Sequence, residues 1–113
     1  MNEMKNLNGD WYPLGSALAC VGKGWHRLVA ALIEDLFALG WDGSLYQIKE
    51  KFGGLRFYIG SETPQIADRI LKAEGESLRT CEVCGRDGKQ RGQAWITTRC
   101  DECHQEDELR KKT

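Results

Sequence analysis

Four cysteines in two close pairs constrain this chain more than any other feature of its sequence. Cys81 and Cys84 form the first pair, fifteen residues follow, and Cys100 and Cys103 form the second pair. Two intervening residues allow both thiolates of a pair to reach one ion from a single turn, and two such pairs complete a tetrahedron. The spacing therefore predicts one structural Zn²⁺ held by these four cysteines.

The identity of the fourth ligand stays open at this point. His104 directly follows Cys103 and could replace it, because imidazole also binds zinc. The repeated pair spacing favours Cys103. Four thiolates would close the coordination shell, which favours structural over catalytic zinc. Since no Ser-His-Asp order, phosphate loop or HExxH helix is visible either, we expect that the protein is not an enzyme.

Composition narrows the class of protein further. The 113 residues match one domain, or one domain with a small module. Sixteen Lys and Arg residues stand against seventeen Asp and Glu residues, which argues against a generally basic nucleic-acid binder. Unpaired thiolates suit a reducing cytoplasm, and no apolar run is long enough to span a bilayer. We therefore expect a cytoplasmic protein without a membrane partner.

The segment before the cysteines predicts two helices around a β-hairpin, preceded by a short helix near residues 13–20. Apolar residues recur at spacings of three and four over 24–39, which is typical of an amphipathic helix. Thr63 and Pro64 are a typical N-cap and first helical residue for a second helix, expected to end near Leu78.

The hairpin is predicted from alternating apolar residues. They alternate over 45–49 and again over 55–59, and the glycine-rich stretch 50–54 has the length of a hairpin connection. This alternation places Tyr46 and Ile48 on one side. An isolated hairpin is marginal in water, so the two helices are expected to cover its apolar face.

The C-terminal part predicts a zinc knuckle, a hairpin and a helix. Residues 94–97 are expected to form the strand that returns from a basic loop. The chain after Cys100 lacks Gly and Pro and carries acidic residues first and basic residues last, as a helix favours. This order predicts a treble-clef-like finger, with a zinc ribbon as the alternative. The fold class is thus α+β, with a flexible N-terminus over 1–9, an α+β unit over 10–79 and the finger over 80–113.

Two stretches resemble known families. Residues 81–106 resemble the C-terminal zinc finger of the DksA/TraR proteins, through the four cysteines, Gly85, Arg91 and the helix that follows. The spacing between pairs is shorter here, and residues 1–80 contain no counterpart of that family's long coiled coil. This resemblance implies RNA polymerase, which those proteins bind in its secondary channel, as a candidate partner.

The chain as a whole, especially residues 48–58, resembles small uncharacterised proteins of tailed phages and prophages. That resemblance implies an origin in a mobile element and assigns no activity. We therefore expect a phage-encoded regulator or inhibitor that binds a host protein, with RNA polymerase or a defence system as candidates. Trp11 and Trp41 lie in loop-like segments, and either is a candidate anchor for such a partner, although core packing is the default for both. The oligomeric state stays open.

The alternative function is nucleic-acid binding. Lys49, Lys51 and Arg56 lie on the hairpin near Phe52 and Tyr58, and basic side chains interleaved with aromatic ones can hold single strands. The finger loop over 86–91 adds further cations, namely Arg86, Lys89 and Arg91.

The remaining residues of interest have ordinary structural readings. Trp25 lies on the apolar stripe of its helix and is expected in the core, and Trp95 is expected to pack between the finger and the rest. Cys20 has apolar neighbours and is expected to be a small buried thiol. His26 is expected to be an ordinary helix histidine.

Overall fold

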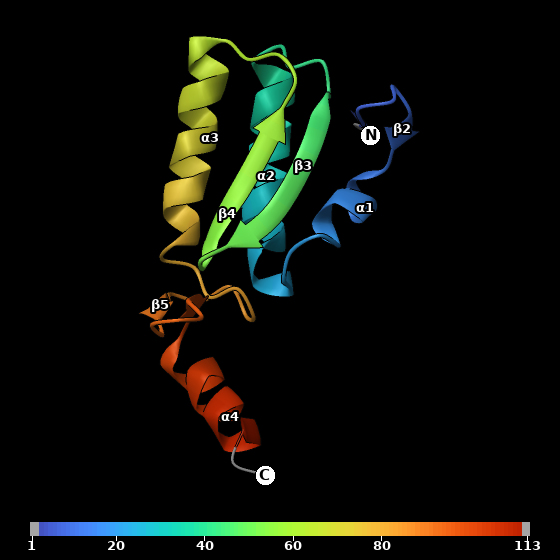
Figure 1. The fold of residues 1–113 in the computed structure, drawn as a ribbon. Coiled ribbons are helices and arrows are strands. Elements are labelled where there is room, and N and C mark those ends of the chain that lie inside the picture. The colour runs from blue at the N-terminus through green and yellow to red at the C-terminus, as the bar shows by residue number, and fades with distance from the viewer. Residues whose placement is uncertain (1–2, 112–113) are drawn as a thin grey trace.

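The computed structural model describes residues 3–111 and shows an α+β fold, as the sequence predicts (Figure 1). Its strands form three antiparallel pairs, β1–β2, β3–β4 and β5–β6. The elements in chain order are β1 (Met4–Lys5), β2 (Trp11–Tyr12), α1 (Leu14–Leu18), the 3-10 turn η1 (Lys23–Trp25), α2 (His26–Ala38), β3 (Leu45–Lys51), β4 (Gly54–Ile59), α3 (Pro64–Ser77), β5 (Lys89–Arg91), β6 (Thr97–Arg99) and α4 (Asp101–Lys111).

The core lies between the β3–β4 hairpin and helices α2 and α3. Helix α2 runs behind the hairpin and α3 lies beside β4 (Figure 1). Helix α4 projects away from this core, on the far side of β5. Trp25 is fully buried, as expected, and its indole N–H donates to the Thr80 carbonyl at 2.8 Å. The other large, fully buried apolar side chains of this cluster are Met4, Val29, Leu32, Leu36, Leu45 and Leu55.

Helix α3 begins where its capping residues predict. The Thr63 hydroxyl accepts a hydrogen bond from the Ile66 backbone N–H at 3.3 Å, and Pro64 is the first helical residue. At its other end Ser77 is fully buried, and its hydroxyl accepts from the Leu55 N–H at 2.9 Å. The helix is therefore tied to β4 by a polar contact as well as by its apolar stripe.

Gly75 offers a direct test of how α3 is stabilised. It lies inside the helix, and a Cβ added there would meet no heavy atom within 4 Å. Glycine in a helix interior costs about 0.5–1 kcal/mol relative to alanine. We expect Gly75→Ala to stabilise the protein by about that amount, seen as a thermal unfolding midpoint a few degrees higher. A lower midpoint would contradict the packing described for this helix face.

The β3–β4 turn is tighter than the sequence predicts. The strands extend through Lys51 and from Gly54, so the connection is only Phe52 and Gly53. Both residues have positive φ, 53° at Phe52 and 78° at Gly53. This combination is typical of a type I′ turn, whose twist matches that of the flanking strands.

A register shift in β3 corrects the predicted position of Tyr46. The shift lies between Leu45 and Gln47 and brings Leu45 and Ile48 into the core. Tyr46 is exposed, so the expectation that it shares a side with Ile48 is wrong. A bulge interrupts strict alternation because it adds one residue to one strand.

Of the segment 1–9, which is expected to be flexible, residues 1–2 lie outside the described residues and part of the remainder is held on the core. Residues 4–5, inside the segment expected to be flexible, form β1 and pair with β2, and the Met4 side chain is fully buried. The Lys5 N–H also donates to the Gly43 carbonyl at 2.6 Å. This part of the segment is therefore held on the core, because Met4 completes its apolar cluster.

The finger consists of the cysteine knuckle, the β5–β6 hairpin and α4. The returning strand, predicted over 94–97, is found two to three residues later, as β6 spans Thr97–Arg99. The residues before it form a loop, which begins at Gly92 with φ of 97° and continues through Trp95. Trp95 is 80% exposed, so the expectation that it packs between finger and body is wrong. The chain after Cys100 is helical, where a ribbon would have a third strand.

Candidate metal centre

Three elements position the four cysteines. Cys81 and Cys84 follow α3 in a tight turn, in which the Gly85 N–H donates to the Cys81 carbonyl at 2.9 Å. Cys100 directly follows β6, and Cys103 lies in the first turn of α4. The Cys103 N–H points at the Cys100 sulfur, 3.4 Å away. The hairpin thus returns the second pair to the first.

The sulfur positions fit a tetrahedral ion. The four Sγ atoms lie within 4.8 Å of one another, and those of Cys84 and Cys100 are 3.6 Å apart. Zn–S bonds of about 2.3 Å in a tetrahedron require sulfur separations of roughly 3.8 Å. Cys103 belongs to the cluster and His104 does not. Within residues 3–111 this is the only group of His, Cys, Asp and Glu side chains placed to hold a metal.

The pKa values of three of the four thiols are shifted, two downward and one upward. The Arg86 backbone N–H is the main reason that the pKa of Cys84 falls to about 6. Burial acts to raise the pKa of Cys81, but N–H donors from Cys100, Cys84 and Val83 bring it below its ordinary value. Burial, followed by the neighbouring sulfurs, raises the pKa of Cys103. Cysteines bind a metal as thiolates, and the positive charge of a divalent ion would offset the repulsion between thiolates held so close together.

The knuckle is docked against η1, a contact that the sequence did not predict. The Gly24 N–H donates to the Glu82 carbonyl at 3.0 Å. A Cβ on Gly24 would overlap the Cys81 carbonyl oxygen and lie 2.7 Å from the Gly85 nitrogen. The signal in the sequence was Gly22-Lys23-Gly24 before the first long helix, where close backbone approach requires glycine.

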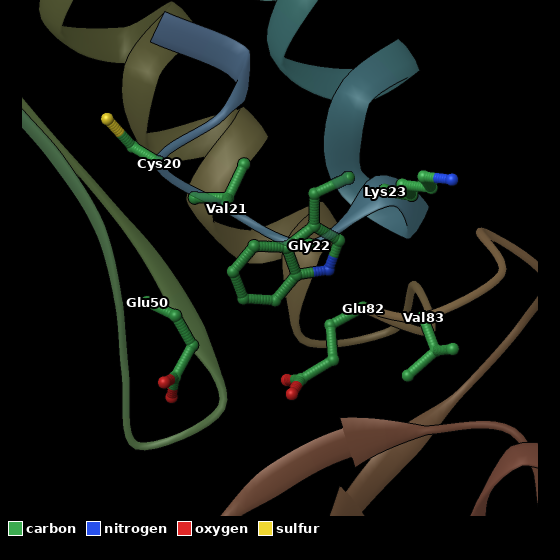
Figure 2. A pocket seen from close by; sticks show the side chains of 8 residues that line it. Cys20, Val21, Gly22, Lys23, Glu50, Glu82 and Val83 are labelled. Carbon is green, nitrogen blue, oxygen red and sulfur yellow. The ribbon is translucent and has the colours of Figure 1, made fainter. Parts of the chain in front are cut away.

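Beside this contact lies an open cavity of about 420 Å³. Figure 2 shows Glu50 of the hairpin and Glu82 of the knuckle extending toward the same side of it, while the Cys20 sulfur points away from both. Burial raises the pKa of Glu82, and the Glu50 carboxylate adds to the effect. Cys20 is exposed, so the expectation of a buried thiol is wrong. His26 is half-buried, with Nε2 3.1 Å from the Val21 carbonyl.

The cations expected in a free finger loop are partly engaged. Arg86 pairs with Glu102 at 3.1 Å, and Arg91 pairs with Asp101 and donates to the Arg99 carbonyl. The Arg91 hydrogen bond lowers the pKa of Asp101. Lys89 and Arg91 are strand residues of β5. Arg86 and Arg91 are therefore engaged within the finger, although most of the stretch 86–91 remains exposed.

The hairpin cations are placed differently. The β3–β4 register sets Lys49 directly opposite Arg56. The Lys49 ammonium lies 5.8 Å from the Tyr58 ring centroid, and the Lys51 ammonium 5.7 Å from that of Phe52. These basic and aromatic side chains thus share one surface, as the sequence suggests.

The two tryptophans expected as anchors differ in exposure. Trp11 is 57% exposed, whereas Trp41 is only 4% exposed and packs at a tilt against the rings of Phe37 and Phe57. Trp41 is therefore a core residue, the default for an isolated tryptophan, and of the two candidate anchors only Trp11 is exposed. The loop-like sequence around it hid this burial, because apolar contacts from α2 and β4 decide it.

Comparison of the chain with protein-family models, curated proteins and solved structures finds no match. Among residues 3–111, no helix has the length and apolar character needed to cross a membrane.

Proposed function

We propose that this chain is a zinc-stabilised nucleic-acid-binding protein whose contact surface is the outward face of the β3–β4 hairpin. It acts by binding, without a catalytic step. The observation that carries the proposal is the composition of that face. By the strand register its side chains are those of Gln47, Lys49, Lys51, Arg56 and Tyr58, together with Gly54.

Within the described residues, the cations on this face lack a carboxylate partner. The one carboxylate of the two strands, Glu50, pairs with Leu55 on the opposite side. None of the three cations forms an ion pair with a carboxylate of residues 3–111. Like charges directly across a strand pair are destabilising, so Lys49 opposite Arg56 costs stability. A bound phosphate backbone would offset that repulsion, so the opposed cations support a role for this face in nucleic-acid binding.

In this proposal the finger has a structural role and holds the turn of the β3–β4 hairpin in place. We take it to be a treble clef, because a knuckle and hairpin lead into a helix that carries the last ligand. The four cysteines fit one structural Zn²⁺, and folding of the finger would be linked to binding of that ion. Four thiolates fill the coordination shell of zinc, which supports a structural role.

A second candidate is binding of a host protein, supported by the exposed Trp11. Aromatic side chains of this kind are common anchors at interfaces. The resemblance of the finger to that of the DksA/TraR proteins would make RNA polymerase the first partner to test, with a defence system next. In either case the resemblance to phage proteins would place the chain in the cytoplasm of a bacterial host.

Charge reversal on the hairpin tests the proposal. We expect the unaltered protein to bind a fluorescent oligothymidine of about 15 nucleotides, with a slope of log K against log salt near −2, as roughly three phosphate contacts on a single strand predict. Lys49→Glu with Arg56→Glu should abolish this binding, measured by fluorescence anisotropy. Circular dichroism and zinc content should stay unchanged.

The matched control is Lys23→Glu with Lys72→Glu. Both lysines are exposed, lie outside the hairpin face and give the same change in net charge. Binding that survives the hairpin variant, or falls equally in both variants, would count against this face as the contact surface.

A further inference from the structure

The tip of the β3–β4 hairpin carries an aromatic residue where the backbone disfavours one. Phe52 has φ of 53°, a conformation that non-glycine residues rarely adopt, and two-residue turns of this kind favour Asn-Gly. Its side chain is 59% exposed, so burial in the core does not offset the strain. Strained, exposed residues of this sort concentrate at functional sites.

The turn is held firmly against the finger. The Thr98 hydroxyl is buried and donates to the Gly53 carbonyl at 2.6 Å. The Gln90 side-chain amide donates to the Phe52 carbonyl at 3.2 Å. The Glu50 carboxylate accepts from the Gly53 N–H at 2.7 Å, which directs one of its oxygens to the backbone. These contacts fix the backbone of Phe52 and leave its ring free.

A second exposed aromatic faces the same space. A cavity of about 300 Å³ lies between the hairpin tip and the β5–β6 loop, and both Phe52 and Trp95 line it. Trp95 is the most exposed large apolar side chain of residues 3–111. The remaining lining residues are Glu50, Lys51, Ala94 and Ile96. Two exposed rings thus border one small cleft, with the Lys51 ammonium beside one of them.

We propose that Phe52 and Trp95 form a base-stacking clip that makes the binding surface selective for single-stranded nucleic acid. Unpaired bases would stack on the two rings, while the connecting phosphates run along Lys51, Lys49 and Arg56. Bases inside a duplex are already stacked on one another and cannot enter the cleft. Stacking on aromatic side chains tolerates every base, so the clip reads strandedness and not sequence. The inference rests on the proposed function and deepens it.

The test compares single-strand and duplex affinity in three variants of the full zinc-bound chain. Phe52→Asn and Trp95→Ala remove one ring each, and Trp11→Ala removes an exposed aromatic on β2, away from the hairpin tip (Figure 1). The probes are the labelled oligothymidine and the same strand annealed to oligoadenosine. Phe52→Asn should fold at least as well as the unaltered protein, because Asn suits this turn.

We expect Phe52→Asn and Trp95→Ala each to weaken single-strand binding by about tenfold or more, the scale of one stacked base. Duplex affinity and the salt slope should stay unchanged, since the phosphate contacts remain. Trp11→Ala should behave as the unaltered protein. If the protein binds the oligothymidine with salt dependence but both ring variants keep their single-strand affinity, the stacking proposal is wrong while the proposed function stands. If the unaltered protein binds neither probe, the proposed function fails and the clip with it, which would leave protein binding as the better reading.

Discussion

Replacing Gly24 with alanine is expected to destabilise the protein by about 2–3 kcal/mol, the scale of an overpacked core site. The added methyl group would overlap the Cys81 carbonyl oxygen and lie 2.6 Å from the Glu82 carbonyl carbon. Both neighbours are backbone atoms, so no side-chain rotation can make room. The knuckle would have to move away from η1, which would break the hydrogen bond from the Gly24 N–H to Glu82.

The measurement is the thermal unfolding midpoint, which should fall by roughly 10 °C for a domain of this size. Zinc affinity should fall as well, because the displaced segment carries Cys81 and Cys84. Gly15→Ala is the matched control, since Gly15 lies in α1 and a Cβ there would meet nothing within 4 Å. Equal midpoints for the two variants would contradict the close contact between knuckle and η1.

Loss of the metal site is expected to have a larger effect. Cys103→Ala should reduce bound zinc from one ion per chain to nearly none and unfold the finger. The free energy of zinc binding at such sites, about 10–16 kcal/mol, is also what stabilises the folded finger. Without the ion, ionised thiolates so close together would repel one another. His104→Ala, the neighbouring change outside the cluster, should keep full zinc occupancy.

Zinc content by atomic absorption and hydrogen exchange of β5 and β6 measure this effect. Amides of α2, which belong to the separate apolar core, should keep most of their protection. The Phe52-Gly53 turn should lose protection with the finger, since Thr98 and Gln90 hold it. Full zinc occupancy in Cys103→Ala would instead move the fourth ligand to His104.

Local signals were sufficient for most elements. The Thr63-Pro64 cap, the period of α2 and the pair spacing of the cysteines each depend on residues near in sequence, and each is found in the structure. Expectations that depended on distant neighbours were less successful. Trp95, which was expected to be packed, is exposed, and of the two candidate anchors Trp41 is buried, because packing partners decide the environment of an isolated tryptophan. The prediction that the Cys20 thiol is buried was wrong for the same reason.

The sequence by itself determined that this chain has an α+β fold with a four-cysteine site near its C-terminus. Periodicity, caps and ligand spacing carry that information, because each reflects the geometry of a single turn, strand or helix. Only the tertiary structure decided that the knuckle rests on Gly24 and that the hairpin tip meets the finger. It also decided which cations stand unpaired and which aromatic rings border a cleft. Such contacts join residues far apart in the chain, so a local pattern such as Gly22-Lys23-Gly24 can mark a close approach, but only the packing of the elements decides the partner.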